Sequence, residues 1–456
     1  MARDTSDDTP ITSKADLVER LEAGARPAAE WRIGTEHEKF PFRLRGHAPV
    51  PYDGEKGIRA LLEGMERRSV WEPILDRERI IGLADPQGGG AISLEPGGQF
   101  ELSGAPLETL HETARELDAH LADAHAVAGP LGIGFLGLGM SPVWRLDATP
   151  AMPKSRYEIM AAYMPKVGRR GLDMMFRTAT VQVNLDFSSE ADMAAKMRVS
   201  IALQPVATAL FANSPFTDGA PNGRLSERAE VWRDVDRDRT GMLPFVFEAG
   251  FGFERYVDWA LDVPMYFVRR DGVYHDATDF TFRQYLAGAL RSRLPGVEPT
   301  LGDWDNHLST LFPEVRLKRY IEMRGADCGP RERIVALSAF WTGLLYDADA
   351  LAGAFDLVRG WSAAERQTMR DAVPTTALAT PFRDGRVLDI ARAALELSRA
   401  GLARRARMAG GRDETRYLAP LDEIVARGTA PAEALLRRWC EDWGGDIDRV
   451  FTAEAL

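Results

Sequence analysis

The sequence contains little cysteine and no long apolar run. Its 456 residues include two cysteines, Cys328 and Cys440, which are too few for the disulfide framework of a small secreted domain. No apolar run approaches the ~18 residues that a membrane-spanning helix needs, so we expect no membrane partner. The first residues are acidic and polar, whereas secretory signals are apolar and transit peptides are poor in acidic residues. We therefore expect a reduced, cytoplasmic protein.

The motifs of several common enzyme classes are missing as well. No G-x-x-x-x-G-K-[ST] motif is present, which excludes a P-loop enzyme, and no G-x-G-x-x-G lies between a strand and a helix. The sequence lacks the G-x-S-x-G motif of serine hydrolases, and its seven histidines are scattered without H-E-x-x-H, which argues against zinc. Acidic residues (68) outnumber basic residues (57), giving a net charge of −11. Nucleic-acid-binding proteins usually carry a basic excess, so we expect no nucleic-acid partner.

The overall composition is that of a folded protein. Hydrophobic residues make up 45% and charged residues 27% of the chain, which is typical of globular domains. We predict a disordered tail over residues 1–12 and one catalytic unit of sheet and helices over residues 13–350. Residues 351–456 are predicted to be a helical part of the same unit, because they are rich in alanine and arginine. Further helices are predicted from Ser13 to Glu22 and over residues 107–128, 191–212 and 331–346.

Four segments alternate apolar and polar residues with a period of two, which is the pattern of strands with one buried face. They are residues 32–40, 91–103, 178–188 and 315–324. Pro96-Gly97-Gly98 is a turn signal inside the second segment, which we interpret as a β-hairpin. If residue 95 pairs with residue 99, residue 93 lies opposite residue 101. The predicted polar faces carry Glu36 and Glu38; Ser93, Glu95, Gln99 and Glu101; Gln182 and Asn184; and Arg316, Lys318, Tyr320, Glu322 and Arg324.

The simplest interpretation is a set of ordinary strands with one solvent-facing side. Two observations favour a binding site instead. Glutamate is mildly disfavoured in strands, and Glu36 with Glu38, like Glu95 with Glu101, would repel each other unless cations neutralise them. Mg²⁺ takes carboxylate oxygens as ligands and keeps substrate phosphates in its shell. The basic residues of segment 315–324 could take the remaining phosphate charge, so the pattern favours a site for metal-bound phosphates.

Longer motifs surround these strands: GTEHEKF (34–40), SLEPGGQFELSG (93–104), RTATVQVNLDF (177–187), LFANSPF (210–216), DRTGMLPF (238–245), residues 256–267 and FPEVRLKRYIEMRGAD (312–327). They resemble the glutamate–cysteine ligases of plants and many proteobacteria. The resemblance implies an α+β, glutamine-synthetase-like fold, with a curved antiparallel sheet, flanking helices and a helical C-terminal part. It also implies ATP-dependent ligation of the γ-carboxylate of L-glutamate to L-cysteine through a γ-glutamyl phosphate, the first step of glutathione biosynthesis.

The same resemblance implies roles for individual residues. It implies two or three Mg²⁺ ions, with Mn²⁺ as a substitute, and ATP as co-substrate. The implied catalytic residues are Glu36, Glu38 and Arg324. The implied metal ligands are Glu36, Glu38, Glu95, Glu101 and Glu322; the implied ATP contacts are Lys318 and Arg324; and the implied contacts of glutamate or cysteine are Gln99, Arg177, Asn184, Arg239 and Tyr266.

Several of these roles have alternatives. Arg239 could form an ion pair with Asp236 or Asp238, Tyr266 could be a packed aromatic side chain, and Lys318 could extend along a strand edge toward solvent. For the whole protein, a related ligase with another acceptor amine and a non-catalytic nucleotide- or metal-binding protein remain open. We expect a monomer or a weak homodimer.

Overall fold

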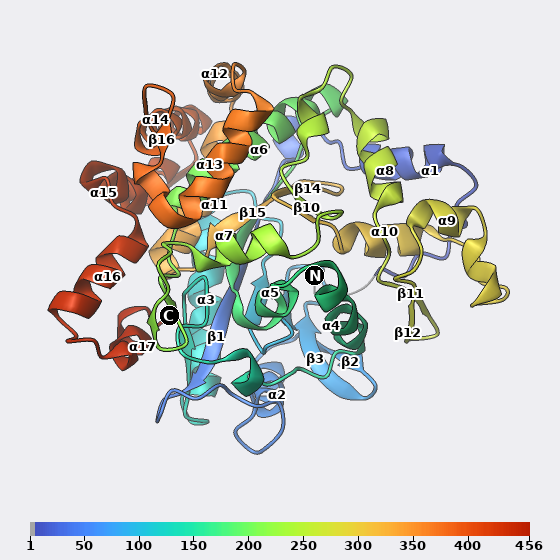
Figure 1. Ribbon diagram of the computed structural model, residues 1–456, viewed down its shortest axis with the longest axis horizontal. Helices are drawn as coiled ribbons and strands as arrows, with labels where there is room; N and C mark the ends of the chain where they lie inside the picture. The colour runs from blue at the N-terminus through green and yellow to red at the C-terminus, as the bar shows by residue number, and fades with distance from the viewer. Residues whose placement is uncertain (1–4) are drawn as a thin grey trace.

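The structure, a computed structural model, describes residues 5–456 (Figure 1). Its centre is an antiparallel sheet of nine strands in the order β14-β15-β7-β1-β5-β4-β3-β2, with β6 pairing the C-terminal end of β1. Strands from the first hundred residues and from residues 315–327 therefore belong to one sheet. The strands are β1 (Ile33–Arg43), β2 (Glu72–Asp76), β3 (Arg79–Ala84), β4 (Ala91–Leu94), β5 (Phe100–Ser103), β6 (Ile133–Leu136), β7 (Thr180–Leu185), β14 (Val315–Leu317) and β15 (Ile321–Asp327).

Three long helices cover the apolar face of this sheet. α6 (Glu190–Leu210) packs on β15, α11 (Arg331–Leu345) packs on β7 and β1, and α3 (Leu110–Ala128) packs on β1 and β6. Val181 and Val183 of β7 are at most 1% exposed and belong to the same core as the helices. The alternation in the sequence therefore identified the buried face of the central strand.

The predicted helices are present, with small shifts of their ends. α1 (Lys14–Glu22) begins with the predicted capping box of Ser13 and Asp16. α3 begins at Leu110 rather than at residue 107 because Thr109 caps it. Within residues 5–456, no single helix is long and apolar enough to cross a membrane, and α11 passes that test only together with the next helix, which is bent from it by 90°.

The C-terminal helices lie together on one side of the molecule, orange to red in Figure 1. The last residues return to the sheet, where the N–H of Gly137 donates to the carbonyl of Glu454 at 2.9 Å. One hydrophobic core extends from Leu17 to Phe451, while the boundary near residue 350 stays a prediction. The helices are α12 (Ala348–Val358), α13 (Ala363–Thr376), α14 (Val387–Arg405), α15 (Ala419–Arg427), α16 (Pro431–Glu441) and α17 (Val450–Ala453).

Shorter elements border the polar face of the sheet and carry side chains into the site described below. They are α4 (Ser155–Val167), α5 (Gly171–Arg177) and α7 (Glu227–Val231). The remaining elements are α2 (Ile58–Arg68), α8 (Phe253–Asp262), α9 (Phe282–Leu286), α10 (Leu301–Ser309), and the two-stranded pairs β8 (Phe216–Thr217) with β9 (Ala220–Pro221), β10 (Thr240–Gly241) with β13 (Phe312–Pro313), β11 (Phe267–Arg270) with β12 (Val273–Asp276), β16 (Pro381–Phe382) with β17 (Gly385–Arg386), and β18 (Met408–Ala409) with β19 (Arg412–Asp413).

Segment 315–324 is a hairpin rather than the single strand that we predicted. β14 ends at Leu317 and β15 begins at Ile321, so that Arg316 lies opposite Glu322. The N–H of Lys318 donates to the carbonyl of Tyr320 at 2.8 Å and closes the turn. The turn has none of the Gly, Pro, Asn or Asp residues that mark most turns, which is why the sequence pattern missed it. Pairing within the hairpin keeps Arg316 and Glu322 together.

The predicted disordered tail, residues 1–12, lies partly outside the described residues. From residue 5 onward, this segment runs beside α10. The N–H of Thr5 donates to Asn306 Oδ1 at 3.0 Å, and the N–H of Leu301 donates to the carbonyl of Thr9 at 2.9 Å. Residues 5–12 are therefore held by defined contacts, contrary to our expectation of disorder.

Candidate active site

A pocket lined by carboxylates opens on the polar face of the sheet. β1 contributes Glu36 and Glu38, and the β4–β5 hairpin contributes Glu95, Gln99 and Glu101. The predicted hairpin register is confirmed, because the N–H of Glu95 donates to the carbonyl of Gln99 at 3.0 Å. Glu38 lies opposite Glu101 in the pairing of β1 with β5. The rest of the lining comes from Pro96, Arg156, Tyr157, Met160, Met174, Met175, Thr178, Thr180, Gln182, Arg228, Trp232, Ser309, Thr310, Phe312, Arg316 and Arg324.

Neutral groups orient two of these carboxylates. Asn184 Nδ2 donates to Glu36 Oε1 at 2.7 Å. Ser93, which lies opposite Glu101 as predicted, donates from its Oγ to Glu101 Oε2 at 2.5 Å. Such hydrogen bonds fix the direction of a carboxylate without cancelling its charge. The orientation of Glu36 and Glu101 is therefore built into the sheet itself.

Glu38 has surroundings that disfavour its ionised form. Burial, together with the charges of Glu95 and Glu101, raises its pKa well above the usual value, although the first N–H of β7 donates to its Oε2 at 3.0 Å. Burial, and after it the charge of Glu322, also raises the pKa of Glu36. Opposite charge nearby would favour the ionised forms of both, so this part of the pocket is suited to accept a cation.

Glu322 of β15 has the opposite surroundings, although its side chain is fully buried. Arg316 contacts both of its oxygens, with Nε 2.6 Å from Oε2 and Nη2 2.9 Å from Oε1. Arg324 Nη1 lies 2.8 Å from Oε2, and Lys318 Nζ lies 3.4 Å from Oε1. Burial by itself would raise the pKa of Glu322, but the three cations outweigh it and hold the pKa well below the usual value.

Arg324 reaches the pocket at an irregularity in β15. Two residues of β15, Arg324 and Gly325, lie opposite the single residue Gln182 of β7. An extra residue of this kind is a β-bulge, which changes the direction of the side chains beside it. Arg324 Nη1 donates to Gln182 Oε1 as well as to Glu322. The bulge thus places a guanidinium at the edge of the carboxylate pocket.

The chemistry of this pocket suits a hard divalent cation. Mg²⁺ and Mn²⁺ prefer oxygen ligands, and the carboxylates of Glu36, Glu38, Glu95 and Glu101 supply them from two neighbouring strand segments. Within residues 5–456, no three His, Cys, Asp or Glu side chains already converge at the spacing of one bound ion. The donor set therefore matches a divalent cation in chemical type and charge but not in spacing.

A second pocket adjoins the first, and Glu36 lines both of them. One wall is the Gly88-Gly89 loop before β4, and Asn184 also lines this second pocket. The other lining residues include the basic side chains of Arg26, Arg32 and Arg319, together with Gly34, Ser103, Gly104, Pro106, Asp186 and Tyr320.

Three predicted substrate contacts line neither pocket. Arg239 is fully buried, its Nε lies 2.6 Å from Asp236 Oδ2, and its guanidinium stacks 3.9 Å from the ring centre of Tyr266. Tyr266 is 1% exposed. For these two residues the structure matches the alternatives, an ion pair and a packed aromatic side chain. Arg177 is also buried and forms ion pairs with two aspartates.

Two other predicted residues, Gln99 and Lys318, have surroundings that differ from a simple substrate contact. Gln99 lines the first pocket, but its Nε2 donates to the carbonyls of Met175 at 3.2 Å and Thr178 at 2.8 Å. It therefore joins the hairpin to α5. Lys318 lines a separate hollow beside Tyr320, close to Glu322.

Sequence reasoning missed the residues that α4 and α7 bring to the pocket. Arg156 and Tyr157 lie in the first turn of α4, Arg228 lies on α7, and Trp232 follows it. The hydroxyl of Tyr157 donates to the carbonyl of Leu94 at 2.8 Å and so joins α4 to the hairpin. Neither helix carries a spacing motif, and no strand alternation marks these positions, so the sequence offered no signal for them.

Comparison with known proteins narrows the chemistry that such a pocket can serve. The sequence matches the model of glutamate–cysteine ligase family 2 (GCS2) over residues 32–453. The chain belongs to this glutamate–cysteine ligase family. The chloroplastic glutamate–cysteine ligase of Brassica juncea is 57% identical over 442 residues, which cover 97% of this chain and 84% of that enzyme. The Arabidopsis thaliana enzyme is 56% identical over the same share of this chain and 82% of its own length.

The fold of the ligase family is also recognisable at low sequence identity. A crystal structure of the glutamate–cysteine ligase of Francisella tularensis in complex with AMP matches with a TM-score of 0.55 and 12% identity. The match covers 93% of this chain and 88% of that one. Together with the antiparallel sheet, its flanking helices and the C-terminal helices, this confirms the predicted α+β fold class.

The comparison contradicts the expected cytoplasmic location. The Brassica juncea, Arabidopsis thaliana and Medicago truncatula relatives are all named as chloroplastic enzymes. The acidic character of the N-terminal residues, on which we based the expectation, is therefore not a guide to the compartment of this protein.

Proposed function

We propose that this protein joins the γ-carboxylate of L-glutamate to the amine of L-cysteine with ATP, giving γ-glutamylcysteine, ADP and phosphate, the first step toward glutathione. The observation that carries the proposal is a carboxylate-lined pocket bordered by arginines, in a chain that belongs to the glutamate–cysteine ligase family. A carboxylate is a poor acyl donor. Transfer of a phosphoryl group to it supplies a leaving group that the cysteine amine can displace.

We assign the divalent cations of this reaction to Glu36, Glu38, Glu95, Glu101 and Glu322, which would hold two or three Mg²⁺ ions, or Mn²⁺ in their place. Bound ions of this kind neutralise the triphosphate and the charge that develops on the transferred phosphoryl group. The raised pKa values of Glu36 and Glu38 support the assignment, because burial and then the neighbouring carboxylates disfavour their ionised forms, which a bound cation would stabilise. Glu322 would contribute from β15, which β7 separates from β1, and Arg316, Lys318 and Arg324 keep it ionised there.

Arg324 is the proposed contact of the transferred phosphoryl group. It shares Glu322 Oε2 with Arg316, so it can move to a phosphate oxygen while Glu322 stays paired. Guanidinium groups suit this role because their planar N–H groups match phosphate oxygens. Lys318 adds positive charge from the turn beside it. The nucleotide itself is proposed to lie in the second pocket, which the Gly88-Gly89 loop, three arginines and Glu36 line together.

The amino-acid substrates are proposed to lie in the first pocket. Arg156 and Arg228 border it and can bind the α-carboxylates that both amino acids carry. Met174, Met175 and Trp232 form its apolar walls, and methionine and aromatic side chains suit a substrate with aliphatic and sulfur atoms. Asn184 and Gln99 are proposed to orient the carboxylates and the hairpin, while Arg177, Arg239 and Tyr266 support the walls from behind.

The reaction then has two balanced steps at the boundary of the two pockets. The γ-carboxylate oxygen of glutamate attacks the γ-phosphorus of ATP, and the bond to the β-γ bridging oxygen breaks, releasing ADP. The cysteine amine attacks the γ-carbonyl carbon, phosphate leaves with the bonding electrons, and the amine loses a proton. Arg324 balances the charge of the phosphoryl group in both steps.

The test is a product assay with a panel of acceptor amines. Purified protein, Mg²⁺, ATP and glutamate are incubated with cysteine, alanine, 2-aminobutyrate, glycine or ammonia, and the products are identified by mass spectrometry alongside ADP release. We expect γ-glutamylcysteine as the preferred product. Efficient ligation of another amine with little use of cysteine would indicate a related ligase, and ADP release without any ligated product would contradict the proposal.

A further inference from the structure

α5 and α7 border the amino-acid pocket and are too short to be stable alone. α5 has seven residues and carries Met174 and Met175, and α7 has five residues and carries Arg228, with Trp232 directly after it. Isolated helices of this length do not form in water, because helix nucleation is unfavourable. Contacts with other parts of the protein must therefore set their positions.

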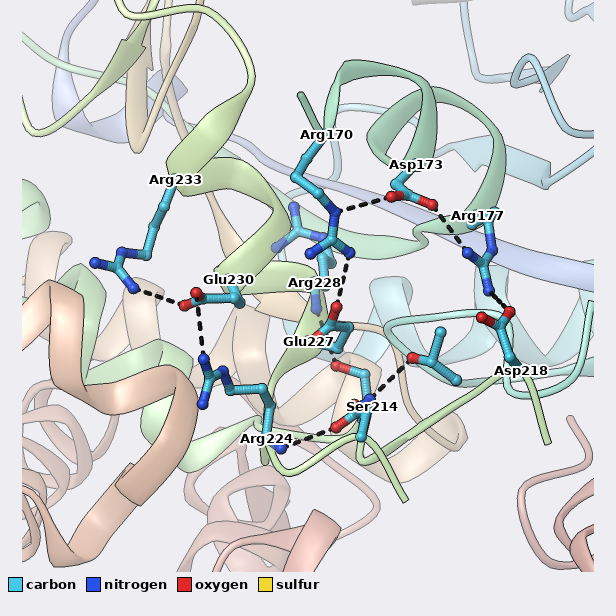
Figure 2. A network of polar contacts seen from close by, with 12 residues as sticks. Arg170, Asp173, Arg177, Ser214, Asp218, Arg224, Glu227, Arg228, Glu230 and Arg233 are labelled. Atoms are coloured by element: carbon cyan, nitrogen blue, oxygen red, sulfur yellow. Dashed lines mark hydrogen bonds and ion pairs between the residues drawn. The ribbon is translucent and has the colours of Figure 1, made fainter. Parts of the chain in front are cut away.

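A chain of ion pairs, whose members line neither of the two pockets, supplies such contacts (Figure 2). Arg170, the residue before α5, places Nε 2.8 Å from Asp173 Oδ2 and Nη2 2.7 Å from Glu227 Oε1. Asp173 uses its other oxygen for Arg177 Nη1 at 2.9 Å. Arg170 thus bridges an aspartate within α5 to the first residue of α7. We call Arg170, Asp173, Arg177 and Glu227 the ionic clamp.

The clamp has a third attachment in the β8–β9 hairpin. Arg177 Nη2 lies 2.5 Å from Asp218 Oδ1, and Asp218 is at the tip of that hairpin (Figure 2). Asp218 has a φ of 54° and Gly219 a φ of 87°, so the tip is a tight turn. The N–H of Gly219 donates to the carbonyl of Pro142 at 2.9 Å. The far end of α5 is therefore fixed to a turn that is itself anchored.

Most side chains of these ion pairs are largely buried, while that of Arg170 is 30% exposed. The side chains of Arg177 and Glu227 are 6% and 10% exposed, and that of Asp173 is 18% exposed. Pairs on an exposed surface contribute little because water screens them, whereas removing one partner of a buried pair leaves an uncompensated charge. Removing Arg170 would leave Glu227 without the ion pair that it forms here, whereas Asp173 would keep its ion pair with Arg177.

The clamp acts on the pocket through two consecutive residues of α7. Glu227 is held by Arg170, while Arg228 is buried on the pocket side, where its Nη2 donates to the carbonyl of Arg324 at 2.8 Å. At the same end of α7, Ser226 Oγ donates to Asp327 Oδ1 at 2.8 Å, and Arg228 follows Glu227 directly in the helix. A shift of Glu227 would therefore turn Arg228 and Trp232 relative to Met174 and Met175.

We infer that Arg170, acting through Glu227 and Asp173, is a positioning residue that sets the distance between the α5 and α7 walls and so determines affinity for the amino-acid substrates. The inference rests on the proposed function, because it concerns the pocket assigned to glutamate and cysteine. Nucleotide binding is predicted to change much less, since the second pocket shares no residue with α5 or α7, and α7 contacts Arg324 only at its backbone carbonyl.

The test compares Arg170→Met with the matched control Arg169→Met. Arg169 is the preceding arginine, is 91% exposed and pairs only with Asp234 among the ion pairs of the described residues, so its loss removes one positive charge without breaking the clamp. For Arg170→Met we expect the KM for glutamate, for cysteine or for both to rise roughly ten-fold. The KM for ATP should stay within about two-fold, as should all three KM values of Arg169→Met.

A double-mutant comparison separates the clamp from a general loss of structure. Glu227→Gln keeps the shape of the side chain and should raise the same KM. Adding Glu227→Gln to Arg170→Met should cause little further change in KM, because both variants remove the same ion pair between Arg170 and Glu227. If Arg170→Met does not fold, Glu227→Gln alone is compared with Arg169→Met. Unchanged amino-acid KM values, a matching rise in the KM for ATP, or independent effects that multiply in the double variant would overturn the inference. Absence of γ-glutamylcysteine formation by the wild-type protein would instead overturn the proposed function.

Discussion

Glu38 and Glu322 lie on the same face of one sheet, separated only by β7, and both are buried. Glu38 faces Glu95 and Glu101, and its pKa is raised by burial and by their charges. Glu322 is surrounded by Arg316, Lys318 and Arg324, and its pKa is lowered in spite of burial. One half of the site therefore balances its charge with the protein's own arginines. The other half has an excess of negative charge that a proton or a metal ion can balance.

The difference in charge balance suggests that the two halves of the site have different roles. Charge that the protein balances itself is fixed in place and can position a phosphoryl group without further ordering. Charge that is left unbalanced draws cations from solution and ties their binding to that of the substrate phosphates. Removing a charged side chain should therefore have opposite effects on stability in the two halves, and different effects on activity.

The largest expected effect is on activity and comes from the carboxylate-rich half. We expect Glu101→Gln and Glu95→Gln each to lower kcat/KM by at least about 10³-fold, roughly 4 kcal/mol, because an amide is a much weaker ligand for Mg²⁺. The proteins should still fold, as judged by circular dichroism. Glu396→Gln, an exposed position on α14, is the matched control and should keep wild-type activity. Wild-type activity in Glu95→Gln or Glu101→Gln would remove that residue from the proposed metal ligands.

A smaller effect, on stability, is expected from the balanced half. Arg316→Met removes the residue that contacts both oxygens of Glu322 and leaves a buried carboxylate with weaker compensation. We expect a loss of about 3 kcal/mol in the free energy of unfolding, measured by chemical denaturation at neutral pH. Arg319→Met, an exposed neighbour in the turn between β14 and β15, should change it by less than about 0.5 kcal/mol. Equal stabilities of the two variants would show that Glu322 does not depend on Arg316.

These two predictions depend on features that the sequence revealed to different degrees. Period-two alternation located Glu36, Glu38, Glu95 and Glu101 correctly, because side-chain direction along a strand follows from local geometry. It could not reveal that Arg316 and Glu322 face each other across a hairpin, since the turn between them has no turn-forming residue.

Residues away from the strands were harder to predict, for physical reasons. The role of Arg177 in the ionic clamp depends on segments that meet only in the folded protein, whereas the ion pair of Arg239 with Asp236 is local and was among the alternatives that the sequence offered. Arg156 and Arg228 enter the pocket from short helices that are positioned by tertiary contacts. Local pattern thus predicted the sheet and its carboxylates, and the walls of the pocket required the structure.

The smallest expected effect is a pH dependence of stability in metal-free protein. A raised folded-state pKa means that Glu38 keeps its proton after the unfolded chain has lost its own, so stability falls as pH rises from the unfolded value of about 4.3 through the folded value. Glu322 behaves in the opposite way, and its contribution is lost as pH falls below about 4.3. With a chelator present at about pH 8, Glu38→Gln should have a melting temperature about 1–2 °C above that of the wild type. A lower melting temperature at that pH would contradict the unbalanced charge around Glu38.

The most direct test of the account is whether the carboxylate-rich half binds divalent cations. Mn²⁺ binding is measured by electron paramagnetic resonance for the wild type, Glu38→Gln and the control Glu396→Gln, and Mg²⁺ is then added as a competitor. We predict that the wild type and Glu396→Gln bind Mn²⁺ equally, that Mg²⁺ displaces it, and that Glu38→Gln binds at least about ten-fold more weakly. The same Mn²⁺ affinity in all three proteins, or no displacement by Mg²⁺, would contradict the assignment of the metal site.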